Sequence, residues 1–148
     1  MAHQGPGGRA TEPDLAWART GAFFYILWAG LHLIAALMIL EPASQGVEPG
    51  ATLGRVRQNS AFMAIVSLGA IWIALRFNWR NHSFGFWFNL YLISATDLAF
   101  VFLVLVPGWE PLPQGLIGPT LWVLGAAASS IGHLRIRPSR RSYQEIER

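Results

Sequence analysis

The stretch 83-SFGFWFNLYLISATDLAFVFLVLVPGW-109 decides how this chain folds. It is almost continuously apolar, and its one charged side chain is Asp97. A run of about 20 apolar residues is enough to cross the ~30 Å hydrocarbon core of a bilayer as a helix. Because a carboxyl group is costly to bury there, an intramembrane acid is by default a functional or partner-binding position.

Three further apolar runs accompany this one. The four expected spans cover about residues 17–40, 58–75, 84–106 and 116–136. The composition agrees, because 53% of the residues are hydrophobic and 13% are charged, against about 25% charged in an average soluble domain. The sequence therefore predicts an all-α fold, an integral membrane bundle of four transmembrane helices with short loops.

The segments around these spans give the expected organisation. Residues 1–16 are predicted to be a flexible tail, 17–137 the transmembrane domain and 138–148 a charged tail that lies near anionic lipid. Segments 42–54 and 109–115 are rich in Pro and Gly and are predicted to be loops. The short basic turn at 76–83 makes the second and third spans antiparallel neighbours.

Arginine predicts the orientation. The chain has no lysine, and its eleven cationic residues are all Arg. Four spans place nine of them on one side and only Arg55 and Arg57 on the other, so both termini are expected in the cytoplasm of a bacterium with the protein in its inner membrane. Because the Arg residues flank apolar spans, the basic charge is explained by topology and no nucleic-acid partner is expected.

Absent residue types exclude several chemistries. Without cysteine the chain forms no disulfide, thiolate nucleophile, Cys-ligated zinc site or iron–sulfur cluster. Without lysine it forms no Schiff base. The histidines lack the spacing of a metal motif, so no metal site is predicted. A haem needs one axial histidine, which His32 or His133 can supply, although no motif points to a haem.

Helical spacing collects polar residues on one stripe of each of the first three spans. Asp97 shares its stripe with Asn89 and Ser94. His32 lies about 12 Å below the predicted outer end of its span, and Asp97 lies about 14 Å below the end of its own. We therefore expect a polar pocket in the outer half of the membrane, roofed by the Pro-rich loops.

The predicted site follows from this common depth. Asp97 and His32 are the candidate catalytic acid and base. The candidate ligand-binding residues are Arg57, Asn59, Ser67, Tyr25, Trp28 and Ser94. Such a site suits a lipophilic small molecule with a polar group, and proton transfer between Asp97 and His32 suits an isomerase or a hydrolase.

A different interpretation is a non-catalytic accessory subunit of a larger membrane complex. In that case Asp97 pins the helices together by pairing with His32 or an amide. Small residues recur four apart, as in Gly125 with Ser129, and such pairs let helices approach closely. They fit a compact bundle or a homo-oligomer contact. Membrane lipids are the remaining expected partners, and the turn 78–82 suits either a lipid headgroup contact or an ordinary positive-inside anchor.

One family comparison follows from size and topology. The chain is similar in both to the small four-helix membrane epoxide isomerases that bind haem. Members of that family carry a haem-binding histidine at the start of the second helix, where this chain has 55-RVRQN-59. No residue role is therefore carried over from that family.

Overall fold

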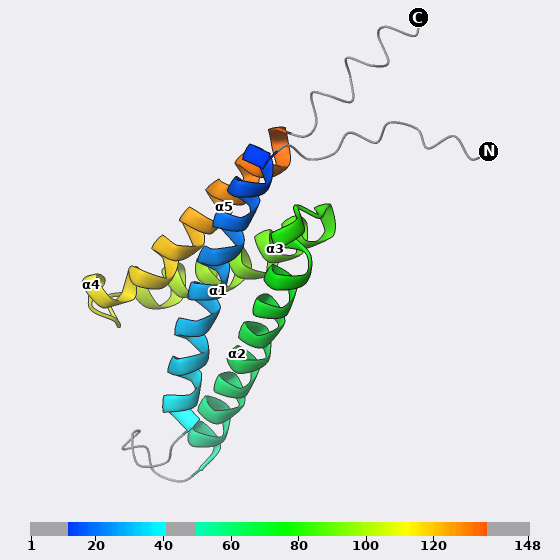
Figure 1. Cartoon of the computed structure of the whole chain (residues 1–148). Coiled ribbons are helices and arrows are strands. Elements are labelled where there is room, and N and C mark those ends of the chain that lie inside the picture. Colours follow the sequence, from blue (N-terminus) through cyan, green and yellow to red (C-terminus); the bar gives the residue numbers. More distant parts are fainter. Residues whose placement is uncertain (1–11, 41–49, 136–148) are drawn as a thin grey trace, which may run out of the picture.

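The computed structural model describes residues 12–40 and 50–135, and these residues are almost entirely helical. The long helices are α1 (Glu12–Leu40), α2 (Ala51–Arg76), α3 (Ser83–Phe100) and α5 (Ile117–Arg135). Shorter elements are η2 (Asn78–Arg80), the π-helical turn η3 (Val101–Leu105) that extends α3, and α4 (Leu112–Gly115). Figure 1 shows these elements as one elongated bundle.

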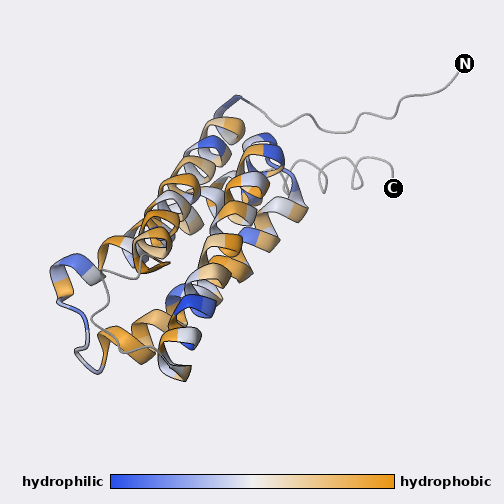
Figure 2. Ribbon diagram, turned by 90° about the horizontal axis from the view of Figure 1, so that it is seen from below, coloured by the Kyte–Doolittle hydropathy of each residue, from blue (hydrophilic) through white to orange (hydrophobic). Residues whose placement is uncertain are grey.

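Within the described residues, four helical segments are long and apolar enough to cross a membrane: Leu15–Leu40, Ala51–Arg80, Ser83–Leu105 and Leu112–Arg135. The predicted all-helical fold, with four apolar helices of membrane-spanning length, is thus confirmed. Hydrophobic residues make up most of each long helix, and most of the hydrophilic residues lie near the helix ends (Figure 2).

Several predicted boundaries differ from the structure. α1 begins at Glu12, so residues 12–16 are helical and do not belong to the tail that was expected there. α2 begins at Ala51, which places Arg55 and Arg57 within its first two turns. The predicted roof loop 109–115 contains α4. The remainder of the N-terminal tail, most of loop 42–54 and the charged C-terminal tail lie outside the described residues.

α1 is the central helix of the bundle. It packs along both α2 and α5, while α3 packs against α2 and α5 on the far side. The start of α1 and the end of α5 lie at the same end as the turn between α2 and α3 (Figure 1). We call this the turn end. The opposite end, where α1 ends and α2 begins, is called the cavity end.

Glycines allow α1 and α5 to approach closely. A Cβ atom on Gly125 would lie 2.9 Å from two ring carbons of Tyr25, and one on Gly21 would lie 2.7 Å from the backbone nitrogen of Ser129. The pair Gly125 and Ser129 therefore serves a contact within one chain. Close backbone approach through small residues replaces the hydrophobic drive that is missing in lipid.

The turn between α2 and α3 is fixed to the bundle. Asn81 adopts a left-handed conformation with φ of 53°, and its Nδ2 donates a hydrogen bond of 2.9 Å to the carbonyl oxygen of Gly132 in α5. Asn78 is buried, 3% exposed. His82 caps α3, because its Nδ1 accepts a hydrogen bond from the backbone N–H of Phe84. The dense polar turn is thus mainly a connection between helices.

Candidate ligand cavity and its histidine–aspartate pair

A cavity of about 540 Å³ lies at the cavity end of the bundle. Its walls come from α1, α2, α3 and the segment from Glu110 to Gly118. Most of the lining is apolar, and its polar side chains are His32, Asn59, Ser60, Thr96, Glu110 and Gln114. A mainly apolar cavity with a few convergent polar groups is typical of a small-molecule site.

His32 is held in one orientation by the preceding turn of α1. Its Nδ1 lies 2.8 Å from the carbonyl oxygen of Trp28, and its ring stacks on the Trp28 indole with centroids 4.1 Å apart. Because a carbonyl oxygen only accepts, Nδ1 must carry the proton in this contact. In the neutral ring Nε2 is then the basic nitrogen.

The side chains of Asp97 in α3 and His32 in α1 both lie close to Gly118, at the start of α5. The position that a Cβ on Gly118 would occupy is 3.0 Å from Cε1 and 3.5 Å from Nε2 of His32, and 3.6 Å from Oδ1 of Asp97. Only a glycine leaves this space open, so Gly118 lets the two side chains face the same point. The two side chains thus approach one point from α1 and α3, with no hydrogen bond between them.

The surroundings of Asp97 are closed. Its side chain is fully buried and does not line the cavity itself. Neither carboxylate oxygen has a hydrogen-bond partner among the described residues, and the same holds for the buried Nε1 of Trp28 in α1. A buried carboxyl group without partners is energetically unfavourable, so packing of the described residues does not by itself account for an acid at this position.

The other predicted ligand-binding residues separate into two groups. Asn59 lines the cavity. Tyr25, Trp28 and Ser67 are fully buried in the bundle and do not line it. Ser94 accepts a 2.9 Å hydrogen bond from Nε1 of Trp122, which links α3 to α5. These four residues therefore lie in the packed interior.

Arg57 also lies apart from the cavity lining. Its side chain is half-buried, and its Nε is buried without a hydrogen-bond partner among the described residues. Its position in α2 is near the cavity end, about one turn before the lining residue Ser60.

Glu110 and Gln114 are among the cavity residues that did not enter the sequence prediction. Both follow α3, in the segment expected to form only a roof. The sequence does single out Glu110, because it is the only acidic residue between Asp97 and Glu145. The sequence could not assign Glu110 to the cavity, because the direction of a side chain in a short connection depends on tertiary packing.

The described residues contain no group of three or more His, Asp or Glu side chains that could hold a metal ion. His133, the other candidate haem ligand, stacks on Phe86 with ring centroids 4.3 Å apart and planes 10° apart. Its ring is thus part of the packing between α3 and α5.

Comparison with known proteins adds no assignment. Neither the protein-family models, nor the curated proteins, nor the solved structures include a match to this chain.

Proposed function

We propose that this is an integral membrane protein that binds a lipophilic small molecule in the cavity and transfers protons to or from it through His32. The observation that carries the proposal is the approach of His32 and Asp97 to one point beside Gly118, with His32 also lining a cavity of about 540 Å³. An acid and a base at one site suit an isomerase, and a hydrolase is the second reaction class.

The roles of the two side chains follow from their positions. The hydrogen bond from Nδ1 to the Trp28 carbonyl leaves Nε2 of His32 to accept a proton from the ligand. Asp97 then stabilises the imidazolium that forms, or supplies the proton that His32 passes on. Asp97 is a positioning residue in this scheme, because it acts through His32 and does not line the cavity.

The lining indicates the class of ligand. Leu31, Ile39 and Phe100 supply apolar wall, whereas Asn59, Gln114 and Glu110 supply hydrogen-bonding groups. A hydrocarbon body with one polar group would match both parts. Within the membrane, such a molecule would enter the cavity without crossing water.

The test is to purify the protein in mild detergent and identify retained lipophilic molecules by extraction and mass spectrometry. We expect His32→Gln to lose the retained molecule and His82→Gln, the matched change at the turn end, to keep it. Asp97→Asn should keep the molecule and lose its conversion. Conversion is followed as deuterium uptake from heavy water for an isomerase, or as uptake of heavy oxygen from labelled water for a hydrolase.

Two results would contradict the proposal. One is a folded wild-type protein that retains no lipophilic molecule. The other is a His32→Gln variant that retains and converts the molecule as the wild type does.

The complete burial of Asp97 favours a second candidate, the accessory subunit of a larger membrane complex. Here the carboxyl group would hold α1 and α3 together and carry out no chemistry. Gentle purification separates the candidates, since obligate recovery with other subunits would support this one. A chain recovered alone or as a homo-oligomer, with its ligand, would support the first.

A further inference from the structure

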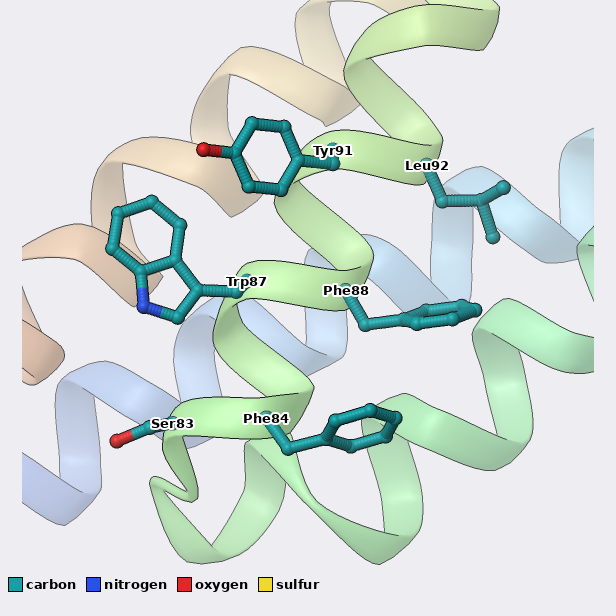
Figure 3. Close-up of a pocket in the computed structure, with 6 residues that line it drawn as sticks. All are labelled: Ser83, Phe84, Trp87, Phe88, Tyr91 and Leu92. Atoms are coloured by element: carbon teal, nitrogen blue, oxygen red, sulfur yellow. The ribbon is translucent and has the colours of Figure 1, made fainter.

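A second hollow lies on the outer surface of α3, on the part of the helix that precedes the residues lining the ligand cavity. It is a groove of about 640 Å³ lined almost entirely by apolar atoms of Ser83, Phe84, Trp87, Phe88, Tyr91 and Leu92. Figure 3 shows Phe84, Phe88 and Leu92 along one side of the helix and Trp87 and Tyr91 along the other. The groove therefore runs lengthwise along α3 between two ridges.

Aromatic rings contact one another within each of the two ridges. Trp87 and Tyr91 stack with ring centroids 5.7 Å apart, and the rings of Phe84 and Phe88 are 5.6 Å apart. Even so, Tyr91 is 67% exposed and Phe84 is 49% exposed. The described part of the chain leaves this face of α3 uncovered.

A cation lies at the turn end of the groove. The guanidinium of Arg76 is 5.8 Å from the centroid of the Phe77 ring, and that ring is 5.2 Å from the ring of Phe84 in the groove wall. Arg76 is exposed and makes no ion pair with the described residues. Arg80, also exposed, belongs to the same turn. The groove thus begins beside unpaired positive charge.

We propose that this groove binds one acyl chain of an anionic phospholipid whose phosphate group is held by Arg76 and Arg80. From Ser83 to Leu92 the groove extends about 14 Å along the helix, which is about half of the ~30 Å hydrocarbon core and so the depth of one leaflet. Guanidinium groups bind phosphate through paired hydrogen bonds. Apolar length, depth and charge therefore all match one lipid molecule.

The same charges oppose a second copy of the chain in this groove. A symmetric dimer through α3 would have both copies in one orientation in the membrane, which brings the arginines of the two turns together. Like charges at an interface are unfavourable. The lipid site does not rest on the proposed ligand cavity, and no residue lines both hollows.

The experiment measures lipid retention by native mass spectrometry of the full chain. The probes are dioleoyl phosphatidylglycerol, which is anionic, and dioleoyl phosphatidylcholine, which has no net charge. We expect preferential retention of phosphatidylglycerol. Arg76→Gln should weaken it about fivefold, the size expected for one cation at a membrane surface.

Matched variants locate the site. Arg135→Gln removes an arginine at the same end of the bundle, one whose guanidinium lies 5.9 Å from the ring of Trp17. Neither residue lines the groove, so this change should leave retention unchanged. Phe88→Ala should weaken retention, whereas Phe102→Ala, an exposed residue beyond the groove, should not. Dihexanoyl phosphatidylglycerol should bind weakly, because its chains are too short to fill the groove.

Equal retention of the two headgroups would overturn the proposal, as would equal losses in Arg76→Gln and Arg135→Gln. Strong binding of the short-chain lipid would show a phosphate site without an acyl-chain groove. A dimer that Phe88→Ala converts to monomer would assign the groove to a second copy. Circular dichroism checks that each variant is folded, and Arg76→Lys, which keeps the charge, should retain more lipid than Arg76→Gln.

Discussion

Gly21 of α1 lies so close to Ser129 of α5 that the two backbones are in direct contact. A Cβ atom at position 21 would come 2.7 Å from the Ser129 backbone nitrogen and would overlap the Ser129 hydroxyl group. α1 meets α5 and α2 over much of its length, so this contact helps to set the position of the helix that carries His32. The candidate site therefore depends on a packing contact at the opposite end of the bundle.

Replacing Gly21 by alanine should destabilise the bundle by about 1–3 kcal/mol, because the new methyl group has no space and backbone atoms must move. The measurement is unfolding in mixed micelles with increasing denaturing detergent. Gly30→Ala is the matched control in the same helix, since nothing lies within 4 Å of its Cβ position. That control should be neutral or more stable by up to about 1 kcal/mol. Equal stability of the two variants would contradict the packing argument.

The hydrogen bond from Asn81 to the Gly132 carbonyl predicts a graded series at one position. Asn81→Gly loses this hydrogen bond, worth about 1 kcal/mol, but tolerates the positive φ. Asn81→Ala loses the same bond and also places a Cβ in the left-handed region, which adds about 1–2 kcal/mol. The free energy of unfolding should therefore fall from wild type to glycine and again to alanine. An alanine variant as stable as the glycine variant would show that the turn relaxes.

The cysteine-free chain allows a direct test of the predicted orientation. Single cysteines replace Ser83 at the turn end and Leu112 at the cavity end, both exposed positions. A membrane-impermeant maleimide applied to intact spheroplasts should label Leu112→Cys only, because the arginine distribution places the turn end in the cytoplasm. Ser83→Cys should be labelled after the membrane is opened. The reverse pattern would invert the topology.

The inward face of α3 shows what helical periodicity in the sequence can predict. Asn89 and Asp97 lie eight residues apart, and both are fully buried, as is Ile93 between them. Their helical spacing alone predicts a common face. In a protein whose outer surface meets lipid, polar side chains on one stripe must point to the interior. The sequence therefore supports this prediction without knowledge of which helix lies opposite.

The same reasoning could not predict which residues line the cavity. Equal depth suggested that Ser67 would join His32, and the stripe shared with Asp97 suggested the same for Ser94. Ser67 is instead enclosed in the core, and Ser94 accepts a hydrogen bond from Trp122. Depth along a helix gives one coordinate, while the direction of each side chain depends on which helix packs beside it. Glu110 was missed for the same reason, since its orientation is decided by the packing of the segment that follows α3.

Hydropathy, helical periodicity and the positions of arginine determined four apolar spans, their inward faces and an expected orientation. These properties are local, because they follow from how each segment partitions between lipid and water. Tertiary structure alone decided that His32 and Asp97 would both approach Gly118. It also decided that the cavity would be lined by His32 and not by Asp97. The reason is physical: close contact between helices depends on the shapes of residues far apart in the chain, and no single segment contains that information.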